Sequence, residues 1–211
     1  MEARESTLSR PILACSSSSD LYALPRSFGF AAIGVGALYR VLQIFISNRM
    51  PNFELLFSAQ LANVKEILPP NVDTDWFIKV KCTNCGEIHD KFVSVNSKET
   101  IPIKGCRSSV NMYLKCKFCY RELTADIIED SIKPYTGDDS GQYRPIARFS
   151  CNGLEPVEFS IRDGWQVTSS STNETVFSDV DLSSGEWTDY DDNAGICLEI
   201  MEIQTNFKLV K

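Results

Sequence analysis

Four of the eight cysteines form two Cys-x-x-Cys pairs, which are separated by thirty residues. A Cys-x-x-Cys turn places two sulfur atoms close enough to bind one metal ion, and two such turns supply a shell of four thiolates. Zn²⁺ suits this shell because it accepts tetrahedral sulfur ligands and has no redox chemistry. We therefore predict one zinc site, with the ligands Cys82, Cys85, Cys116 and Cys119.

The predicted zinc is structural, because a catalytic zinc usually keeps an open coordination position and uses His or carboxylate ligands. The single histidine, His89, follows Cys85 by four residues. We interpret it as an exposed loop side chain, with a substitute ligand or a catalytic base as alternatives. No serine or cysteine lies in a recognisable nucleophile setting, so triad chemistry has little support and we expect no enzymatic activity.

The remaining cysteines are scattered singly at Cys15, Cys106, Cys151 and Cys197. This arrangement does not suit a small secreted scaffold held by disulfides. Free thiols together with a thiolate metal site fit a reducing compartment. We expect a cytoplasmic protein, with the nucleus as a second location and no membrane association.

Composition indicates a soluble globular protein of one domain, since 43% of the 211 residues are hydrophobic and 23% are charged. Residues 1–50 carry five basic and three acidic side chains, which leaves 16 basic and 25 acidic ones in residues 51–211. An acidic body argues against broad binding to a phosphate backbone. We interpret the lysines beside the cysteine pairs as partial neutralisation of the negative four-thiolate centre; they are Lys79, Lys81, Lys115 and Lys117.

Residues 1–49 differ in composition from the rest of the chain. A stretch rich in Ser and Arg, residues 1–27, precedes an apolar run that Arg40 interrupts. A membrane span needs about twenty predominantly apolar residues, so this run is a poor candidate. We predict a disordered or dispensable extension, either an upstream extension of the reading frame before Met50 or an organelle-targeting segment, followed by one zinc-binding β domain over residues 50–211.

Short apolar and alternating runs, broken by turn residues, fill the body of the chain. They predict an all-β fold, a sandwich or a partly open barrel. Leu123–Ile128 fits either a strand or a short helix. The other expected strands are Phe53–Ala62, Trp76–Cys82, Lys91–Val95, Asn111–Lys115, Ile146–Cys151, Val157–Ile161, Trp165–Val167 and Cys197–Leu209.

Two stretches of the body have similar sequences. Phe77–Cys82, followed by Gly86, matches the pattern of Ile146–Cys151, followed by Gly153. The pattern is consistent with two pseudo-repeated β units of which one keeps the metal site. Chance similarity between two β-hairpins is the alternative.

Six acidic side chains lie between Asp179 and Asp192, with Trp187 and Tyr190 among them. The Asp-x-Asp-x-Asp-Gly spacing of a calcium loop is absent. We interpret the stretch as a solvated loop anchored by its aromatic residues. The alternative is a surface for a protein partner, because interfaces combine aromatic residues with polar rims.

The body resembles the eukaryotic CXXC-motif-containing zinc-binding proteins. The resemblance is carried by Trp76…Lys79-Val-Lys-Cys-Thr-Asn-Cys-Gly-Glu87, Lys115-Cys-Lys-Phe-Cys119 with Arg121-Glu122, Ile132-Lys-Pro-Tyr135, Cys151-Asn-Gly-Leu-Glu-Pro-Val157, Phe177-Ser-Asp179 and Glu186-Trp-Thr-Asp-Tyr-Asp191. It covers about residues 50–211 and none of the first 49. It implies an all-β fold with one zinc ion, held by the two cysteine pairs, and assigns no role to Cys106 or Cys197.

These observations together favour a non-enzymatic interaction or adaptor module that acts as a monomer and binds a protein partner. A metal-handling protein that exchanges zinc or copper with a partner is the first alternative. A zinc-ribbon-like nucleic-acid binder is the second, and the acidic body argues against it.

Overall fold

A computed structural model describes residues 50–70, 74–103, 105 and 108–210. The predictions made for residues 1–49, which include Cys15, and for Cys106 lie outside these residues. The described part contains fifteen β-strands and two short 3-10 helices, η1 (Glu129–Ser131) and η2 (Gly137–Asp139). The predicted all-β fold is confirmed. In the same part of the chain, no helix has the length and apolar character that crossing a membrane requires.

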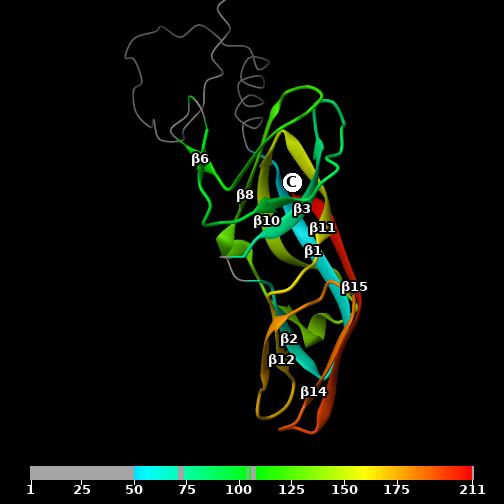
Figure 1. Cartoon of the computed structure of the whole chain (residues 1–211). Coiled ribbons are helices and arrows are strands. Elements are labelled where there is room, and N and C mark those ends of the chain that lie inside the picture. The colour runs from blue at the N-terminus through cyan, green and yellow to red at the C-terminus, as the bar shows by residue number, and fades with distance from the viewer. Residues whose placement is uncertain (1–49, 71–73, 104, 106–107, 211) are drawn as a thin grey trace, which may run out of the picture.

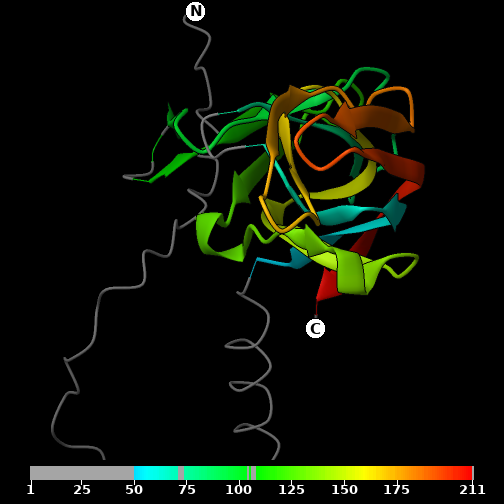
Figure 2. The ribbon, with the colours of Figure 1, turned by 90° about the horizontal axis from the view of Figure 1, so that it is seen from below.

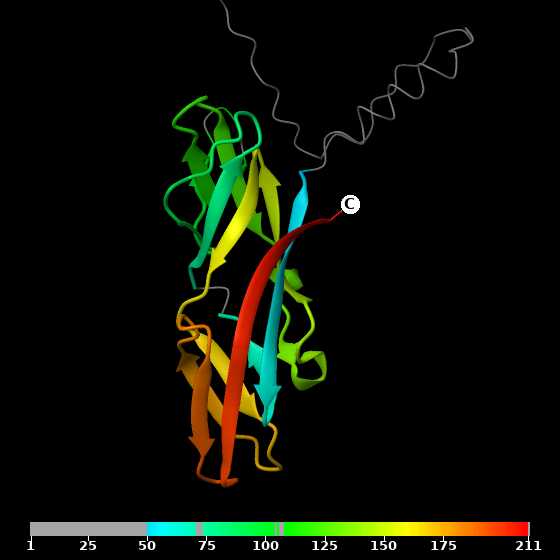
Figure 3. The same cartoon turned by 90° about the vertical axis from the view of Figure 1, so that its right-hand side faces the viewer.

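The largest sheet has six strands in the order β14-β15-β1-β10-β8-β7. Their bounds are β14 (Trp187–Asp191), β15 (Ile196–Val210), β1 (Asn52–Ala62), β10 (Arg144–Asn152), β8 (Glu122–Ile127) and β7 (Met112–Lys115). β1 and β15 are antiparallel partners from Asn52 opposite Val210 to Ala62 opposite Glu199. These two strands run side by side along the long axis of the molecule (Figures 1 and 3).

Three smaller sheets complete the fold. One contains β11 (Leu154–Ser160), β3 (Trp76–Cys82) and β4 (Val93–Val95), and another contains β13 (Val176–Val180), β12 (Trp165–Ser169), β2 (Val64–Leu68) and β9 (Tyr135–Thr136). The third pairs β5 (Ile101–Pro102) with β6 (Ser109–Val110). In the view of Figure 2 the strands curl around a common interior, which is the partly open barrel among the predicted alternatives.

The chain passes from one sheet to another at two corners with left-handed backbone. Asn63, with φ +58°, joins β1 of the largest sheet to β2. Gly153, with φ +74°, joins β10 of the same sheet to β11 of the three-stranded sheet. Asn and Gly are the residues that adopt this conformation at the lowest cost.

The two similar stretches of sequence occupy different environments. β3 pairs with β4, the next strand along the chain, in the three-stranded sheet. β10, by contrast, belongs to the six-stranded sheet and its successor β11 to the three-stranded one. The similar sequences therefore do not build two units with the same strand pairing.

The interpretation of the acidic stretch as a solvated loop is wrong at its two ends. Val176–Val180 forms β13, and Trp187–Asp191 forms β14, the edge strand of the largest sheet. The ring of Trp187 packs on Phe177, with the centroids 5.5 Å apart. Asp191 is 1% exposed, and its carboxylate accepts hydrogen bonds from the hydroxyl of Thr175 and the backbone N–H of Asn193.

Candidate metal centre

The first cysteine of each pair continues the inward-facing side of a β-strand. On β3 the buried residues alternate with partly exposed ones, so that Trp76, Ile78, Val80 and Cys82 face the core. On the other side of the centre, Met112 of β7 and Cys116, four residues later, are both buried. Because side chains alternate between the two sides of a strand, Cys82 and Cys116 both lie on the inward side, and each is 1% exposed.

The two cysteine turns, residues 82–87 and 116–121, have the same backbone hydrogen bonds. In the first turn the N–H of Gly86 donates to the carbonyl oxygen of Cys82 at 2.9 Å, and the N–H of Cys82 donates to that of Glu87 at 2.8 Å. The second turn repeats both bonds, from Tyr120 to Cys116 at 3.1 Å and from Cys116 to Arg121 at 2.9 Å. Each turn therefore presents its two sulfur atoms in the same way.

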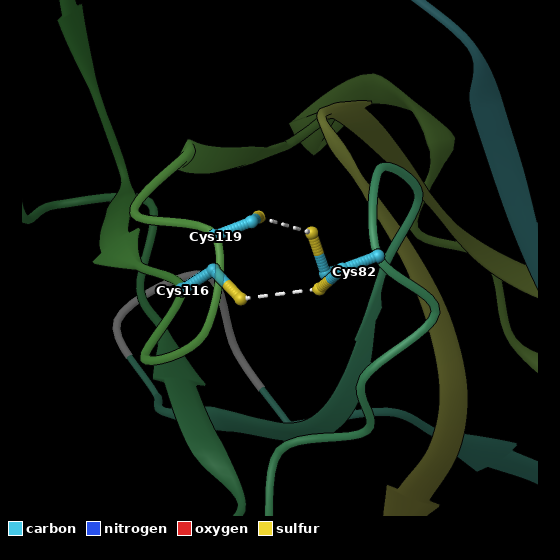
Figure 4. Close-up of side chains that lie close together, drawn as sticks. Cys82, Cys116 and Cys119 are labelled. Atoms are coloured by element: carbon cyan, nitrogen blue, oxygen red, sulfur yellow. Dashed lines mark hydrogen bonds between the residues drawn. The ribbon is translucent and has the colours of Figure 1, made fainter.

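The structure brings all four predicted ligands together. Their sulfur atoms lie within 4.8 Å of one another. Two sulfur–sulfur contacts, drawn as dashed lines in Figure 4, each join one turn to the other: Cys82 Sγ to Cys119 Sγ at 3.6 Å and Cys85 Sγ to Cys116 Sγ at 3.5 Å. Four sulfurs at about 2.3 Å from a tetrahedral zinc ion would lie about 3.8 Å apart, so the cluster fits the ion closely.

Backbone amides already prepare this cluster for negative charge. The N–H of Arg121, helped by the side chain of Asn84, lowers the pKa of the Cys119 thiol to about 6. At Cys85 the N–H of Glu87 acts in the same direction, but burial and hydrogen bonds with the other thiols outweigh it and raise the pKa to about 12. A divalent cation bound by the four sulfur atoms would displace the protons that remain on them.

Gly153 supports both turns from the corner between β10 and β11. Its carbonyl oxygen accepts hydrogen bonds from the backbone N–H and the hydroxyl of Thr83, both at 3.0 Å. A Cβ atom on Gly153 would lie 2.9 Å from the carbonyl oxygen of Glu122, directly after the second turn. The corner therefore fits between the two turns only because residue 153 has no side chain.

The other candidate residues lie outside the sulfur cluster. Cys151 is buried in the core, and burial raises the pKa of its thiol to about 12. Cys197 is an exposed free thiol on β15. His89 is half-buried rather than exposed, and its backbone N–H donates to the carbonyl oxygen of Val80 at 2.8 Å.

Sequence reasoning missed the residues that hold the turns in place. Thr83, Gly153 and Tyr120 carry no metal-binding chemistry of their own. The sequence did contain a signal for Tyr120. This residue follows the second cysteine of its pair, at the position that Gly86 occupies after the second cysteine of the other pair. Nothing in the sequence, however, pairs Thr83 with a corner seventy residues away.

An all-β fold in which two turns bring four cysteine sulfur atoms together defines a protein of the tetrathiolate metal-binding class. Residues 54–208 match the sequence model of the eukaryotic CXXC motif containing zinc binding protein, and the chain belongs to this family. The predicted resemblance is thereby confirmed. The family description and the four-cysteine cluster together indicate zinc binding.

Relatives match over nearly their whole length. The protein of this name from Xenopus laevis is 38% identical over 158 residues, which are 75% of this chain and 98% of the relative. The Homo sapiens protein is 37% identical with the same coverage. The crystal structure of C1orf123 superposes with a TM-score of 0.71 at 36% identity, over 75% of this chain and 99% of that one. A Plasmodium falciparum structure, 20% identical with a TM-score of 0.67, shares the fold.

Proposed function

We propose that the four clustered cysteines hold one structural zinc ion and that the protein is a non-enzymatic interaction module. The observation that carries the proposal is the crossing of the sulfur contacts, since both short contacts join the first turn to the second. The first turn follows β3 of the three-stranded sheet, and the second connects β7 and β8 of the six-stranded sheet. An ion bound there ties two sheets together.

A zinc ion in this position would contribute to folding rather than to turnover. Structural zinc in small peptides provides an apparent binding free energy of about 10–16 kcal/mol at neutral pH, and this becomes folding free energy. The four cysteines fill a tetrahedral shell and leave no coordination position for a substrate. The function then lies on the protein surface that the metal centre keeps in shape.

Chelation tests the structural role directly. The zinc-loaded protein is incubated with EDTA, while zinc release and the far-ultraviolet circular dichroism signal are followed together. A structural ion leaves slowly and in step with unfolding. Rapid release from a protein that stays folded would contradict the proposal.

Metal exchange with a partner is the second candidate, and the exposure of the cluster favours it. Cys85 is exposed and Cys119 is half-buried, so a partner's thiol can approach the ion from this side. In that case the chelation experiment gives fast zinc loss without unfolding. Transfer of zinc or copper to an acceptor protein would then be the activity to measure.

The interaction role is tested by affinity purification of the form that starts at Met50, with and without Cys116 and Cys119. The expected result is a set of co-purifying proteins that depends on intact cysteines and on bound zinc. We further propose a monomer in the cytoplasm. Light scattering after size-exclusion chromatography checks the first point, and imaging of fluorescent fusions with and without residues 1–49 checks the second.

A further inference from the structure

Residues from both cysteine turns line a shallow hollow in the protein surface. Its volume is about 210 Å³, part of it open to solvent, which is room for the end of one side chain. None of the lining residues is a predicted metal ligand, so the hollow is separate from the metal centre. The lining is formed by Glu87, Ile88, His89, Asp90, Lys117 and Phe118.

Two of the lining side chains are apolar and belong to the surface rather than to the core. Phe118 is 67% exposed and Ile88 is 47% exposed. An aromatic ring attracts a cation to its face. The chain itself contains this arrangement elsewhere, because the Cζ atom of Arg162 lies 3.4 Å from the centre of the Phe77 ring. The hollow therefore suits a side chain with an aliphatic stem and a cationic head.

The polar groups of the hollow that lack a partner can accept hydrogen bonds. Glu87 is half-buried, and its carboxylate has no ion pair or hydrogen bond within the described residues. The buried Nε2 atom of His89 also has no partner in this part of the chain, and it is an acceptor when Nδ1 carries the proton. A ligand that brings several donors and a positive charge satisfies both groups.

The charge of the hollow is negative. Its lining contains the carboxylates of Glu87 and Asp90 and a single ammonium group, that of Lys117. Lys117 is paired with Asp90 at 3.8 Å, so the charge of Glu87 is left uncompensated. The body adds attraction at longer range, since residues 51–211 carry 25 acidic and 16 basic side chains. The local and the overall charge both favour a basic ligand.

We propose that this hollow is a docking site for an arginine side chain in a segment of a partner protein. A guanidinium group has five N–H donors and no acceptor, forms paired hydrogen bonds with a carboxylate, and stacks on aromatic rings. Lysine brings the charge without the planar fork, so it should bind more weakly. The inference rests on the proposed interaction function and gives it a place and a partner chemistry. The two carboxylates oppose a nucleic acid, whose phosphates need unopposed cations.

Selection from a random peptide display library tests the proposal, with the zinc-loaded full chain as the target. The expected consensus contains an arginine. Citrulline has nearly the shape of arginine but no charge, and in place of that arginine it should weaken binding at least about tenfold. Lysine at the same position should give an intermediate affinity.

Three variants of the lining separate this site from a general attraction of basic peptides to an acidic protein. Glu87→Gln keeps the shape but removes the uncompensated charge, and should weaken binding of the selected peptides about tenfold. Phe118→Leu keeps an apolar contact but removes the ring, and should weaken binding about two- to fivefold. Lys117→Gln removes the opposing charge, and should strengthen binding about twofold or more.

The matched control is Asp192→Asn, which removes one exposed carboxylate directly after β14. β14 lies at the lower end of the molecule in Figure 1, whereas β3 and β8, which flank the cysteine turns, lie in its upper half. This change should leave binding of the selected peptides unchanged. Zinc content and melting temperature are measured for every variant, so that loss of binding is not confused with unfolding.

An acidic consensus or the absence of enrichment overturns the proposal. So does equal binding of the arginine and citrulline peptides. Equal weakening by Glu87→Gln and Asp192→Asn would show a general attraction to the acidic body in place of a site. Weaker binding to Lys117→Gln would contradict the preference for a cation.

The affinity purification separates this inference from the proposed function. Partners that are lost with Glu87→Gln and retained with Asp192→Asn agree with both. Partners that depend on Cys116 and Cys119 but persist with Glu87→Gln and Phe118→Leu leave the interaction function standing and overturn the docking site. The absence of zinc-dependent partners contradicts the proposed function, and the docking site falls with it.

Discussion

Gly86 and Tyr120 occupy the same position in two turns of the same geometry. Each follows the second cysteine of its pair, has a left-handed backbone, and donates its N–H to the carbonyl oxygen of the first cysteine. In the first turn this position is held by Gly86, which adopts the left-handed conformation freely. In the second turn it is held by Tyr120, for which the same conformation is strained.

Replacement of Tyr120 by Gly should therefore leave the free energy of unfolding within about 1 kcal/mol of its original value. Relief of about 1–2 kcal/mol of backbone strain is offset by the greater chain entropy of glycine and by the lost contact with Lys115. Gly86→Ala, the matched control, should cost about 1–2 kcal/mol. Urea unfolding of the zinc-loaded proteins measures both. A larger loss in Tyr120→Gly than in Gly86→Ala would show that the tyrosine side chain supports the fold.

Loss of a ligand should remove metal and stability together. Cys82→Ser and Cys119→Ser each leave three thiolates, so we expect zinc well below one equivalent and a melting temperature lower by ten degrees or more, on the order of several kcal/mol. Elemental analysis and thermal denaturation measure the two quantities. Cys197→Ser, at an exposed thiol outside the cluster, should change neither. Stoichiometric zinc and an unchanged melting curve in both ligand variants would disprove the four-cysteine assignment.

Gly153→Ala should destabilise the protein and weaken zinc binding. An alanine there must adopt φ +74° and place its Cβ 2.9 Å from the carbonyl oxygen of Glu122, so that the corner and the second turn must move apart. Gly185→Ala is the matched control, because φ is +84° but no atom lies within 4 Å of its Cβ position. The control should lose about 1–2 kcal/mol, and Gly153→Ala clearly more. Competition with a zinc-binding dye should show weaker metal affinity in Gly153→Ala alone, and equal effects in both variants would refute the supporting role.

The buried carboxylate of Asp191 should make stability depend on pH. Burial acts to raise its pKa, but hydrogen bonds from Ser169, Thr175 and two backbone amides outweigh it and lower the pKa in the folded state. A lowered pKa means that the stabilisation is present above the unfolded pKa of about 3.9 and is lost as the pH falls through the folded value. Asp191→Asn should thus melt at a lower temperature at pH 7, and its difference from the original protein should shrink below about pH 4.

Asp192→Asn is the control for this experiment, since it removes the same charge from the neighbouring exposed residue. It should not reproduce the pH-dependent difference. A melting-temperature difference for Asp191→Asn that stays constant down to pH 3 would show that the carboxylate charge plays no part.

The sequence predicted the strands whose side chains alternate and the metal centre they position. Cys82 extends the inward side of an alternating strand, and the paired spacing marks its three partners. β14 was missed because charged Asp189 and Asp191 alternate with Trp187 on one side of the strand, and only the surrounding hydroxyl and amide groups make burial favourable for Asp191.

The division into sheets could not be predicted, since it depends on contacts between distant residues. Asn63 turns the chain from one sheet into another with its side chain bonded to the carbonyl oxygen of Cys197, 134 residues away. Gly153 likewise turns the chain from β10 into β11, and its carbonyl oxygen accepts a hydrogen bond from the distant Thr83. The local sequence pattern indicates which side of a strand is apolar, but it does not indicate which other strand will pair with that strand.

The pairing of β1 with β15 sets an order of events during synthesis. The ribosome produces β1 before every other described strand and β15 after all of them. The edge of β1 that pairs with β15 therefore has no partner until residues 196–210 emerge. The two cysteine turns, by contrast, are complete once residue 121 has been made. Their support at Gly153 follows later in the chain, and the edge of β1 beside Leu55 and Phe57 stays unpaired with β15 for longer still, open to association with other chains until translation is nearly finished.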